Sequence, residues 1–177
     1  MEFNGTCDEI GFETTMDVML TGVGLYGGVQ ASTHDVTLEL LKDGVSVSTT
    51  KTTMISDGSE TPIKVSFEKP VWIPTNTKHV VAATIKGPQT WAGWRGARCD
   101  FEASGKIAFY QTENRNKRSS TEIGQIPVLY VLCARKHHAS NDPWQKKCSL
   151  VWQVAYDNTV LVLLFAKPTA PVTTNIL

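Results

Sequence analysis

The sequence predicts an all-β fold, an antiparallel β-sandwich or barrel formed by a single domain. Three observations lead to this prediction. Several short segments alternate apolar and polar residues with the two-residue period of a half-buried strand. Turn-forming residues separate these segments at intervals of about 8–12 residues. Nothing before residue 132 shows a sustained period of about 3.6 residues, so no helix is expected there.

The individual strands follow from this alternation and from the turns. Leu38 and Leu40 alternate with polar neighbours, and Val45 and Val47 resume the alternation after a turn. Four threonines then favour a pleated, half-buried surface because they are β-branched. The expected strands are 37–41, 45–53, 63–67, 79–85, 106–110 and 126–132, with turns at 42–44, 57–58 and 87–88.

Prolines and polar residues mark the irregular parts of the chain. Pro70 and Pro74 bracket the apolar residues 71–73, which confines that piece to an edge strand or a short strand. Residues 111–122 are polar and charged without any period, so we expect a long loop.

The chain changes character after Leu132. Residues 134–147 are basic and polar, which is typical of a linker or an excursion. Residues 151–165 are apolar and β-branched, and they form either a hairpin that turns at Asp157 and Asn158 or a buried helix.

Composition and charge exclude several classes of protein. The 17 basic and 17 acidic side chains cancel, whereas a nucleic-acid binder usually carries a basic excess. The first residues lack the basic and apolar regions of a signal peptide, and polar residues interrupt the apolar stretch 150–166. We therefore expect no membrane insertion. The four cysteines are too few and too scattered for a disulfide scaffold, which suits a reducing cytoplasm.

No catalytic, metal or cofactor motif is recognised in the sequence. Ser104 lacks the nucleophile-elbow pattern, and His34 and His79 have no recognisable nucleophile beside them. Cys133 and Cys148 with the histidines at 137 and 138 do not have the spacing of a structural zinc site. The glycines at 22, 24, 27 and 28 are not followed by a helix, so we expect them where strands approach closely or φ is positive.

Three stretches carry a pattern that occurs together in one known family. They are residues 22–28 (GVGLYGG), residues 65–73 (VSFEKPVWI) followed by Gly87 and residues 93–96 (GWRG), and residues 124–127 (GQIP). Their order and spacing over residues 8–132 resemble the PHR domain, the module shared by the PAM/Highwire neuronal ubiquitin ligases and certain BTB-domain cullin adaptors. Residues 24–28 are similar to the domains of the large neuronal ligases.

The resemblance implies an antiparallel β-sandwich of the PHR type whose loops at one end bind partner proteins. It implies that residues 8–132 form this domain. Residues 133–177 match nothing in the family, and we interpret them as a divergent C-terminal segment, either a final hairpin or a tail foreign to the family.

The best candidate binding residues lie in two loops. Tryptophan and arginine are enriched at binding hot spots, and glycines let a loop expose large side chains. One tryptophan of the first loop is expected to plug the end of the sandwich. In the second loop, three cations within four residues form a solvated loop or dock an acidic partner segment. The candidates are Trp91, Trp94, Arg95 and Arg98 in the first loop, and Arg115, Lys117 and Arg118 in the second.

Three functions remain open at this point. The first is a non-catalytic interaction module, in the cytoplasm of neurons or at synapses, that recruits proteins, substrates or adaptors of the ubiquitin pathway, for a ligase whose chemistry lies in other domains. The second is a carbohydrate- or small-ligand-binding sandwich that uses Trp91 and Trp94 as stacking platforms. The third is an enzyme with an unrecognised site.

Overall fold

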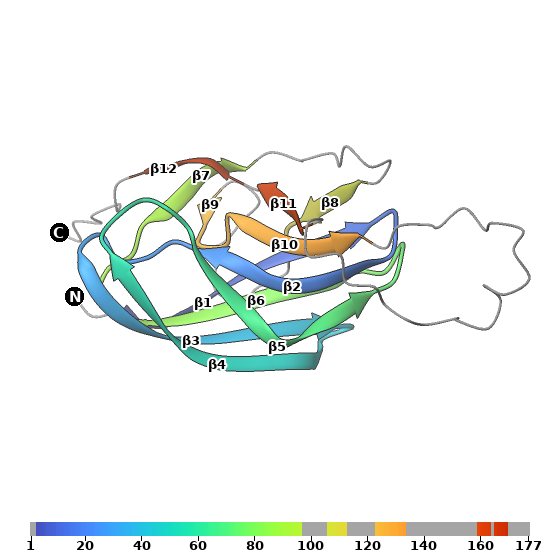
Figure 1. The fold of residues 1–177 in the computed structure, drawn as a ribbon, viewed down its shortest axis with the longest axis horizontal. Helices are drawn as coiled ribbons and strands as arrows, with labels where there is room; N and C mark the ends of the chain where they lie inside the picture. The colour runs from blue at the N-terminus through green and yellow to red at the C-terminus, as the bar shows by residue number, and fades with distance from the viewer. Residues whose placement is uncertain (1–2, 97–105, 113–122, 134–158, 164, 170–177) are drawn as a thin grey trace, which may run out of the picture.

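The structure, a computed structural model, describes residues 3–96, 106–112, 123–133, 159–163 and 165–169. Within these ranges the chain is built from β-strands and contains no helix, which confirms the all-β prediction. Two antiparallel sheets face each other as a sandwich, and a third, smaller sheet lies beside them (Figure 1). The described part of the chain accordingly offers no helix that could cross a membrane.

The strands are numbered along the chain. They are β1 (Phe3–Thr14), β2 (Val18–Leu25), β3 (Ala31–Lys42), β4 (Val45–Asp57), β5 (Ile63–Ile73), β6 (His79–Gly87), β7 (Ala92–Gly96), β8 (Ile107–Tyr110), β9 (Ile123–Gly124), β10 (Val128–Cys133), β11 (Thr159–Leu163) and β12 (Phe165–Thr169).

Three sheets arise from these strands. The first has the order β4-β3-β6-β1-β8, the second β11-β10-β2-β5, and the third β12-β7-β9. In the first sheet β1 pairs with β6 from Asp8↔Ala83 to Phe12↔His79 and with β8 on its other side. The first strand of the chain is therefore an inner strand of its sheet.

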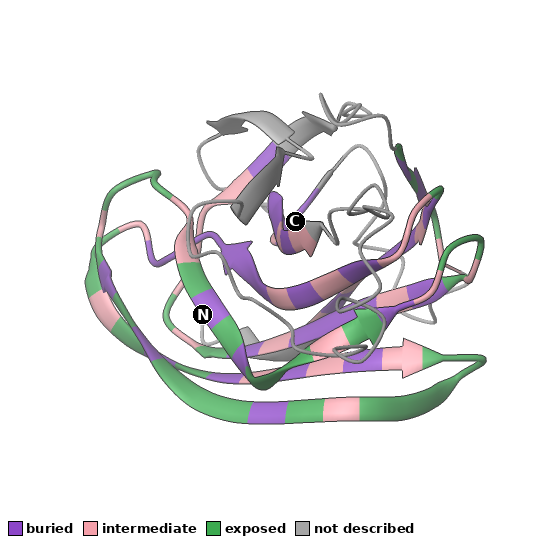
Figure 2. Ribbon diagram, turned by 45° about the vertical axis from the view of Figure 1, so that its right-hand side comes forward, coloured by how far each residue is buried: buried purple, intermediate pink, exposed green. Residues whose placement is uncertain are grey.

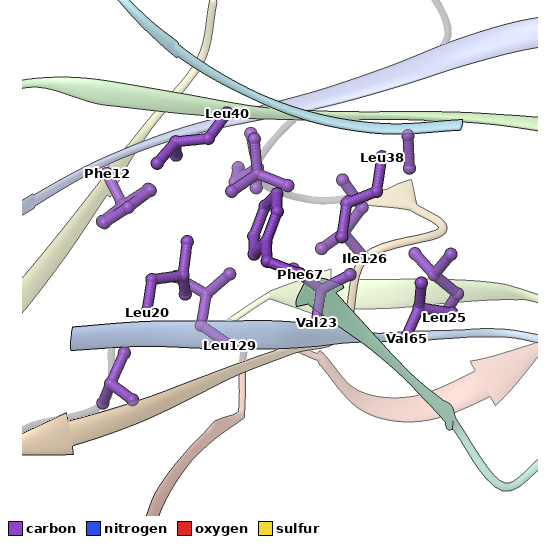
Figure 3. Packing of buried hydrophobic residues seen from close by; sticks show 14 of the residues in the cluster. Phe12, Leu20, Val23, Leu25, Leu38, Leu40, Val65, Phe67, Ile126 and Leu129 are labelled. Atoms are coloured by element: carbon purple, nitrogen blue, oxygen red, sulfur yellow. The ribbon is translucent and has the colours of Figure 1, made fainter. Parts of the chain in front are cut away.

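The core lies between the two larger sheets. Buried residues of β3 and of the first half of β5 alternate with less buried ones, as the period of two predicts, whereas β2, β6 and β10 are buried or half-buried along nearly all of their described length (Figure 2). Figure 3 shows Leu38 and Leu40 facing Val23 and Leu129 across this layer, with Phe67 between them.

Strand β5 leaves its sheet midway and reaches the other one. Leu20 of β2 pairs with Val71 and Gly22 pairs with Ser66, so residues 67–70 of β5 lie opposite residue 21 alone. Within this bulge the Glu68 N–H donates to Oγ1 of Thr50 in β4 at 3.2 Å. The strand also lies at the edge of its sheet, as the flanking prolines predicted.

The close strand approach expected of the glycines is confirmed at Gly22. A Cβ atom placed there would lie 2.8 Å from Cα of Ser66 in the bulged strand, closer than real Cβ contacts come. The alternative expectation, positive φ, is wrong for Gly22, Gly24, Gly27 and Gly28, because positive φ occurs at other glycines.

A tight turn joins β3 to β4, where the sequence predicts one. Asp43 and Gly44 both have positive φ, at 52° and 76°, which is the conformation of a two-residue hairpin turn. The following Val45 and Val47 continue a strand as predicted, but they are 65% and 48% exposed. Their alternation does not mark a buried face, because β4 is an edge strand and Val47 is an extra residue at a bulge.

The C-terminal segment contributes two short strands to different sheets. β11 pairs with β10 from Val128↔Leu163 to Leu132↔Thr159, whereas β12 pairs with β7. The turn that the sequence suggests at Asp157 and Asn158 lies outside the described residues. The division of the chain at residue 133 stays a prediction.

A buried histidine closes the core at the start of β6. His79 stacks on Phe12 with their ring centroids 5.9 Å apart, and its Nδ1–H donates to the Thr77 carbonyl at 3.1 Å. Burial lowers the pKa of His79, and the nearby positive charge of Lys42 lowers it further, although the bond to Thr77 acts in the opposite direction.

This lowered pKa predicts a loss of stability in mild acid. The unfolded chain takes up a proton on His79 near the ordinary histidine pKa of 6.5, whereas the folded chain resists it. The free energy of unfolding should therefore be fully present above that pH and should fall as the pH drops below it. We expect His79→Phe to flatten this dependence below about pH 6.5, measured as melting temperature over a series of pH values. Equal slopes for both proteins would contradict the assignment.

Candidate loop-end binding site

Trp91 connects the loops at one end of the sandwich through two hydrogen bonds. Its backbone N–H donates to the Gly27 carbonyl at 2.9 Å, and its indole Nε1–H donates to the Gly58 carbonyl at 3.2 Å. The ring is half-buried and packs against the core. Trp91 thus occupies the place of the expected plug. We call residues 26–30, 56–58, 87–91 and 124–125 the loop end.

Backbone bonds connect the other segments of the loop end to one another. The Val29 N–H donates to the Gln89 carbonyl at 3.1 Å, and the Tyr26 N–H donates to the Gln125 carbonyl at 3.2 Å. Tyr26 itself is buried in the core. Burial raises the pKa of its phenol, so the hydroxyl stays protonated at neutral pH. Four segments far apart in the sequence are therefore bound into one unit.

The paired glycines pack directly on β4. A Cβ atom at Gly27 would lie 2.8 Å from Cβ of Ser56, whose Oγ–H donates to the Gly28 carbonyl at 3.1 Å. The same Oγ accepts the Gly58 N–H at 3.1 Å. The chain continues from Gly28 into a strand rather than a helix. These glycines therefore serve close packing, which supports the structural interpretation over a phosphate-binding loop.

A second buried histidine lies beneath the loop end. His34 is fully buried, and its Nε2 lies 3.1 Å from the Pro88 carbonyl. Since a carbonyl only accepts, Nε2 carries the proton, and Nδ1 is then an acceptor. Nδ1 is buried and has no hydrogen-bond partner among the described residues. His34 and His79 lie near opposite ends of β6 and do not form a catalytic pair.

Strand β7 begins directly after Trp91 and contains two of the predicted site residues. It is the middle strand of the small sheet, where Trp94 pairs with Lys167 of β12 and with Ile123 of β9. The structure describes only the backbone of Trp94 and Arg95. Strand pairing on both sides fixes the backbone of Trp94, and Arg95 follows it in the same strand.

The structure does not describe the other predicted contact residues. Arg98 of the first loop lies outside the described residues, and so do Arg115, Lys117 and Arg118 of the second. Their role as partner contacts stays a prediction.

The cysteines and histidines are the remaining candidates for metal ligands. The described residues contain no group of three or more His, Cys, Asp or Glu side chains that could hold a metal ion. Residues 137, 138 and 148 lie outside them. Cys7 is a free thiol, and burial raises its pKa, with Glu9, Asp8 and Glu39 adding to the effect. This thiol is protonated at neutral pH and correspondingly unreactive.

The structure also exposes apolar side chains that were not among the contacts predicted from the sequence. Ile55 is 76% exposed and Trp72 is 40% exposed, in addition to the two valines of β4. All four lie on β4 and β5, the edge strands of the two larger sheets. The prolines around Trp72 are a sequence signal for an edge, and Lys51 within a threonine-rich strand is another.

Comparison with known proteins decides the family. The family model of the PHR domain matches residues 2–131, which includes β1 to β9 and most of β10. The chain belongs to the PHR family. The fold agrees with this assignment, because the family resemblance implied an antiparallel sandwich with loops gathered at its end.

Curated proteins similar to this PHR chain are named for a second domain type, BTB/POZ. BTB/POZ domain-containing protein 6-B of Danio rerio is 33% identical over 135 residues, which is 72% of this chain and 27% of that protein. BTB/POZ domain-containing protein 6 of Homo sapiens is 31% identical over 72% of this chain and 24% of its own length. BTB/POZ domain-containing protein 3 of Mus musculus is 28% identical over 72% of this chain and 24% of its own length.

This PHR chain therefore spans about a quarter of the length of the relatives that it matches. These relatives are BTB proteins, so the likeness of residues 24–28 to the large neuronal ligases stays a prediction.

The role of Trp91 in this PHR domain can be tested through stability. Trp91→Phe keeps an aromatic ring but removes the Nε1–H donor, so we expect unfolding free energy to fall by about 1 kcal/mol. Trp91→Ala also removes the packed ring and should cost about 3 kcal/mol. Urea unfolding measures both. The exposed control Ile55→Val should stay within about 0.5 kcal/mol. A fully stable Trp91→Ala protein would show that the plug is dispensable.

Proposed function

We propose that this PHR chain is a non-catalytic module that recruits partner proteins, substrates or adaptors of the ubiquitin pathway, to a ubiquitin ligase in the cytoplasm. The ligase chemistry lies in other domains of the complete assembly. Membership in the PHR family and likeness to proteins named for a BTB/POZ domain support a protein-interaction role. Recruitment to a ubiquitin ligase goes beyond a protein-interaction role, and it rests on what the resemblance to ligase subunits implies.

One observation carries the proposal: the loop end is built in advance of any partner. Trp91 ties Gly27 to Gly58, and two further backbone bonds tie the residue after β2 to the loop before β10 and the loop before β3 to the loop before β7. A surface ordered before binding loses little conformational entropy when a partner arrives, so more of the contact energy appears as affinity.

The geometry favours a protein partner over a sugar. A stacking platform for a carbohydrate needs an accessible aromatic face, and the alternative function relied on two tryptophans. Trp91 packs its ring against the core and bonds its indole N–H to a backbone carbonyl. One of the two platforms is therefore committed to the fold.

The charge of the candidate residues indicates the kind of partner. Five of the seven candidates are cations: two arginines follow Trp94 at positions 95 and 98, and three more cations stand at 115–118. Arginine forms bidentate bonds with carboxylates, and complementary charge guides both encounter and register. An acidic segment of a partner protein fits this set.

Both histidines that the structure describes have packing partners within the fold. His34 bonds to Pro88, and His79 stacks on Phe12. A general acid or base needs access to a substrate proton, so these positions favour binding over catalysis.

The recruiting surface can be tested with the double variant Arg95→Ala/Arg98→Ala. Partners are first captured from neuronal lysate with the purified chain, and the affinity for one purified partner is then measured. If the arginines anchor the partner, affinity should fall about thirtyfold, which corresponds to about 2 kcal/mol. The melting temperature should hold if the two arginines act through partner contact, because surface substitutions usually change stability by less than about 0.5 kcal/mol.

The matched control is Lys42→Ala/Lys69→Ala, which removes two exposed cations away from the loop end. It should leave affinity unchanged. Equal affinity of the arginine double variant and the unmodified chain would remove this loop from the binding site. The ligase link is checked separately: excess free chain should compete for the captured partner and lower its ubiquitylation in cells. Unchanged ubiquitylation would refute the recruiting role while leaving the binding role intact.

A further inference from the structure

Strand β4 presents the longest free edge in the described structure. It has 13 residues and stands at the end of the first sheet, paired with β3 on one side. Among the described residues no strand pairs with its other backbone edge, and β5 only donates the Glu68 N–H to the Thr50 side chain. Figure 2 shows this strand as mostly exposed along the border of the sheet. Such an edge offers a row of backbone N–H and C=O groups to another strand.

The edge is regular enough to act as a template. From Ser48 to Asp57 its pairing with β3 runs without interruption, from Leu40↔Ser48 to Ala31↔Asp57. The irregularity, the bulge at Val47, lies outside this stretch. Four threonines at 49, 50, 52 and 53 favour extended backbone because they are β-branched.

The two faces of β4 differ in availability. Thr50, Met54 and Ser56 are buried and point into the sandwich, where β5 meets the strand through Thr50. By the two-residue period, Lys51 and Ile55 point to the opposite face. Ile55 is the most exposed large apolar side chain among those that the structure describes.

The charge pattern of β4 indicates which kind of strand could pair with it. Lys51 is the single charged residue of β4 before Asp57, and it is the middle residue of the strand. If a second copy paired along the whole of β4, Lys51 would stand opposite Lys51, and directly opposed like charges destabilise a sheet. A strand with an acidic residue at that position would gain a favourable cross-strand pair instead.

We infer that β4 is a second docking site, which takes an extended segment of a different protein as an added antiparallel strand. This segment carries an acidic residue opposite Lys51 and an apolar residue four positions earlier, opposite Ile55. Main-chain bonds supply affinity and the alternate side chains supply specificity. The site does not depend on the proposed recruiting role, because it is recognised through Lys51 and Ile55, which lie outside the loop end, and involves neither Arg95 nor Arg98.

Charge reversal on both partners tests the inference. The probe is a synthetic ten-residue peptide of alternating threonine and valine, with a glutamate four residues after one of the valines. Its matched variant carries lysine in place of the glutamate. The purified full chain should bind the glutamate peptide about fivefold more tightly in fluorescence anisotropy, because the cross-strand pair changes from attraction to repulsion.

The preference should reverse in Lys51→Glu and persist in Lys86→Glu, which alters an exposed lysine on β6 of the same sheet, separated from β4 by β3. Hydrogen exchange should slow in residues 48–55 when the glutamate peptide is added. Both variants exchange exposed side chains, so folding is retained and is checked by melting temperature.

Three results would overturn the inference. Equal affinity for both peptides, or an unchanged preference in Lys51→Glu, would show that peptide binding does not depend on the charge at position 51 of β4. Slowed exchange confined to the loop end would place the peptide elsewhere. The third result is that neither peptide binds but the chain self-associates in sedimentation equilibrium. If Lys51→Glu alters this self-association, a second copy of the chain is the occupant of β4.

Discussion

The apolar layer between the two larger sheets is the interaction on which the rest of this PHR domain depends. Leucines and valines of β3 and β6 meet those of β2 and β10, and burial of this surface is the main term that favours folding. Phe67 stands in the middle of the layer, and it is brought there because β5 bulges away from β2. The bulge of β5 therefore fills the core, and it also closes one side of the sandwich through the bond from Glu68 to Thr50 of β4.

This arrangement leaves two kinds of surface with different physical character. At the loop end, glycines and Trp91 bring several chain segments within bonding distance, which fixes a surface through side-chain and backbone bonds. Along β4, the surface is the strand itself, and its bonding groups belong to the backbone. Recognition at the loop end depends on which side chains it displays, whereas recognition at β4 depends on register and on a few alternate side chains.

Much of the fold could be predicted from the sequence, because alternation and turn residues act locally. The strands around Leu38, Val65, Val81 and Ile107 are evident from their period, and the turn at Asp43 and Gly44 from its composition. Strand β1 was not predicted. Glycine and polar residues dilute its apolar positions, and its outward face is covered in part by Tyr110, which packs on Gly11 from β8. That cover depends on a pairing between distant segments.

The site was less predictable than the fold for the same reason. The plug role of one tryptophan could be expected, but the choice of Trp91 depends on the position of Gly58, which lies 33 residues earlier in the chain. The exposure of Ile55 and Val47 follows from the place of β4 at the border of the sheet, and strand order is not written in any local pattern. Periodicity can show that a residue has two possible faces, but only the sheet order decides whether either face is covered.

The inner position of β1 has a consequence for synthesis on the ribosome. β1 ends at Thr14, but its partners β6 and β8 begin at His79 and Ile107. At about 5–20 residues per second, the first strand waits for several seconds as an extended segment before it can be paired. Meanwhile the local hairpin of β3 and β4 can already form. The nascent domain therefore exposes both edges of β1 together with the edge of β3 that later pairs with β6, and chaperones that bind extended backbone would meet it in that interval.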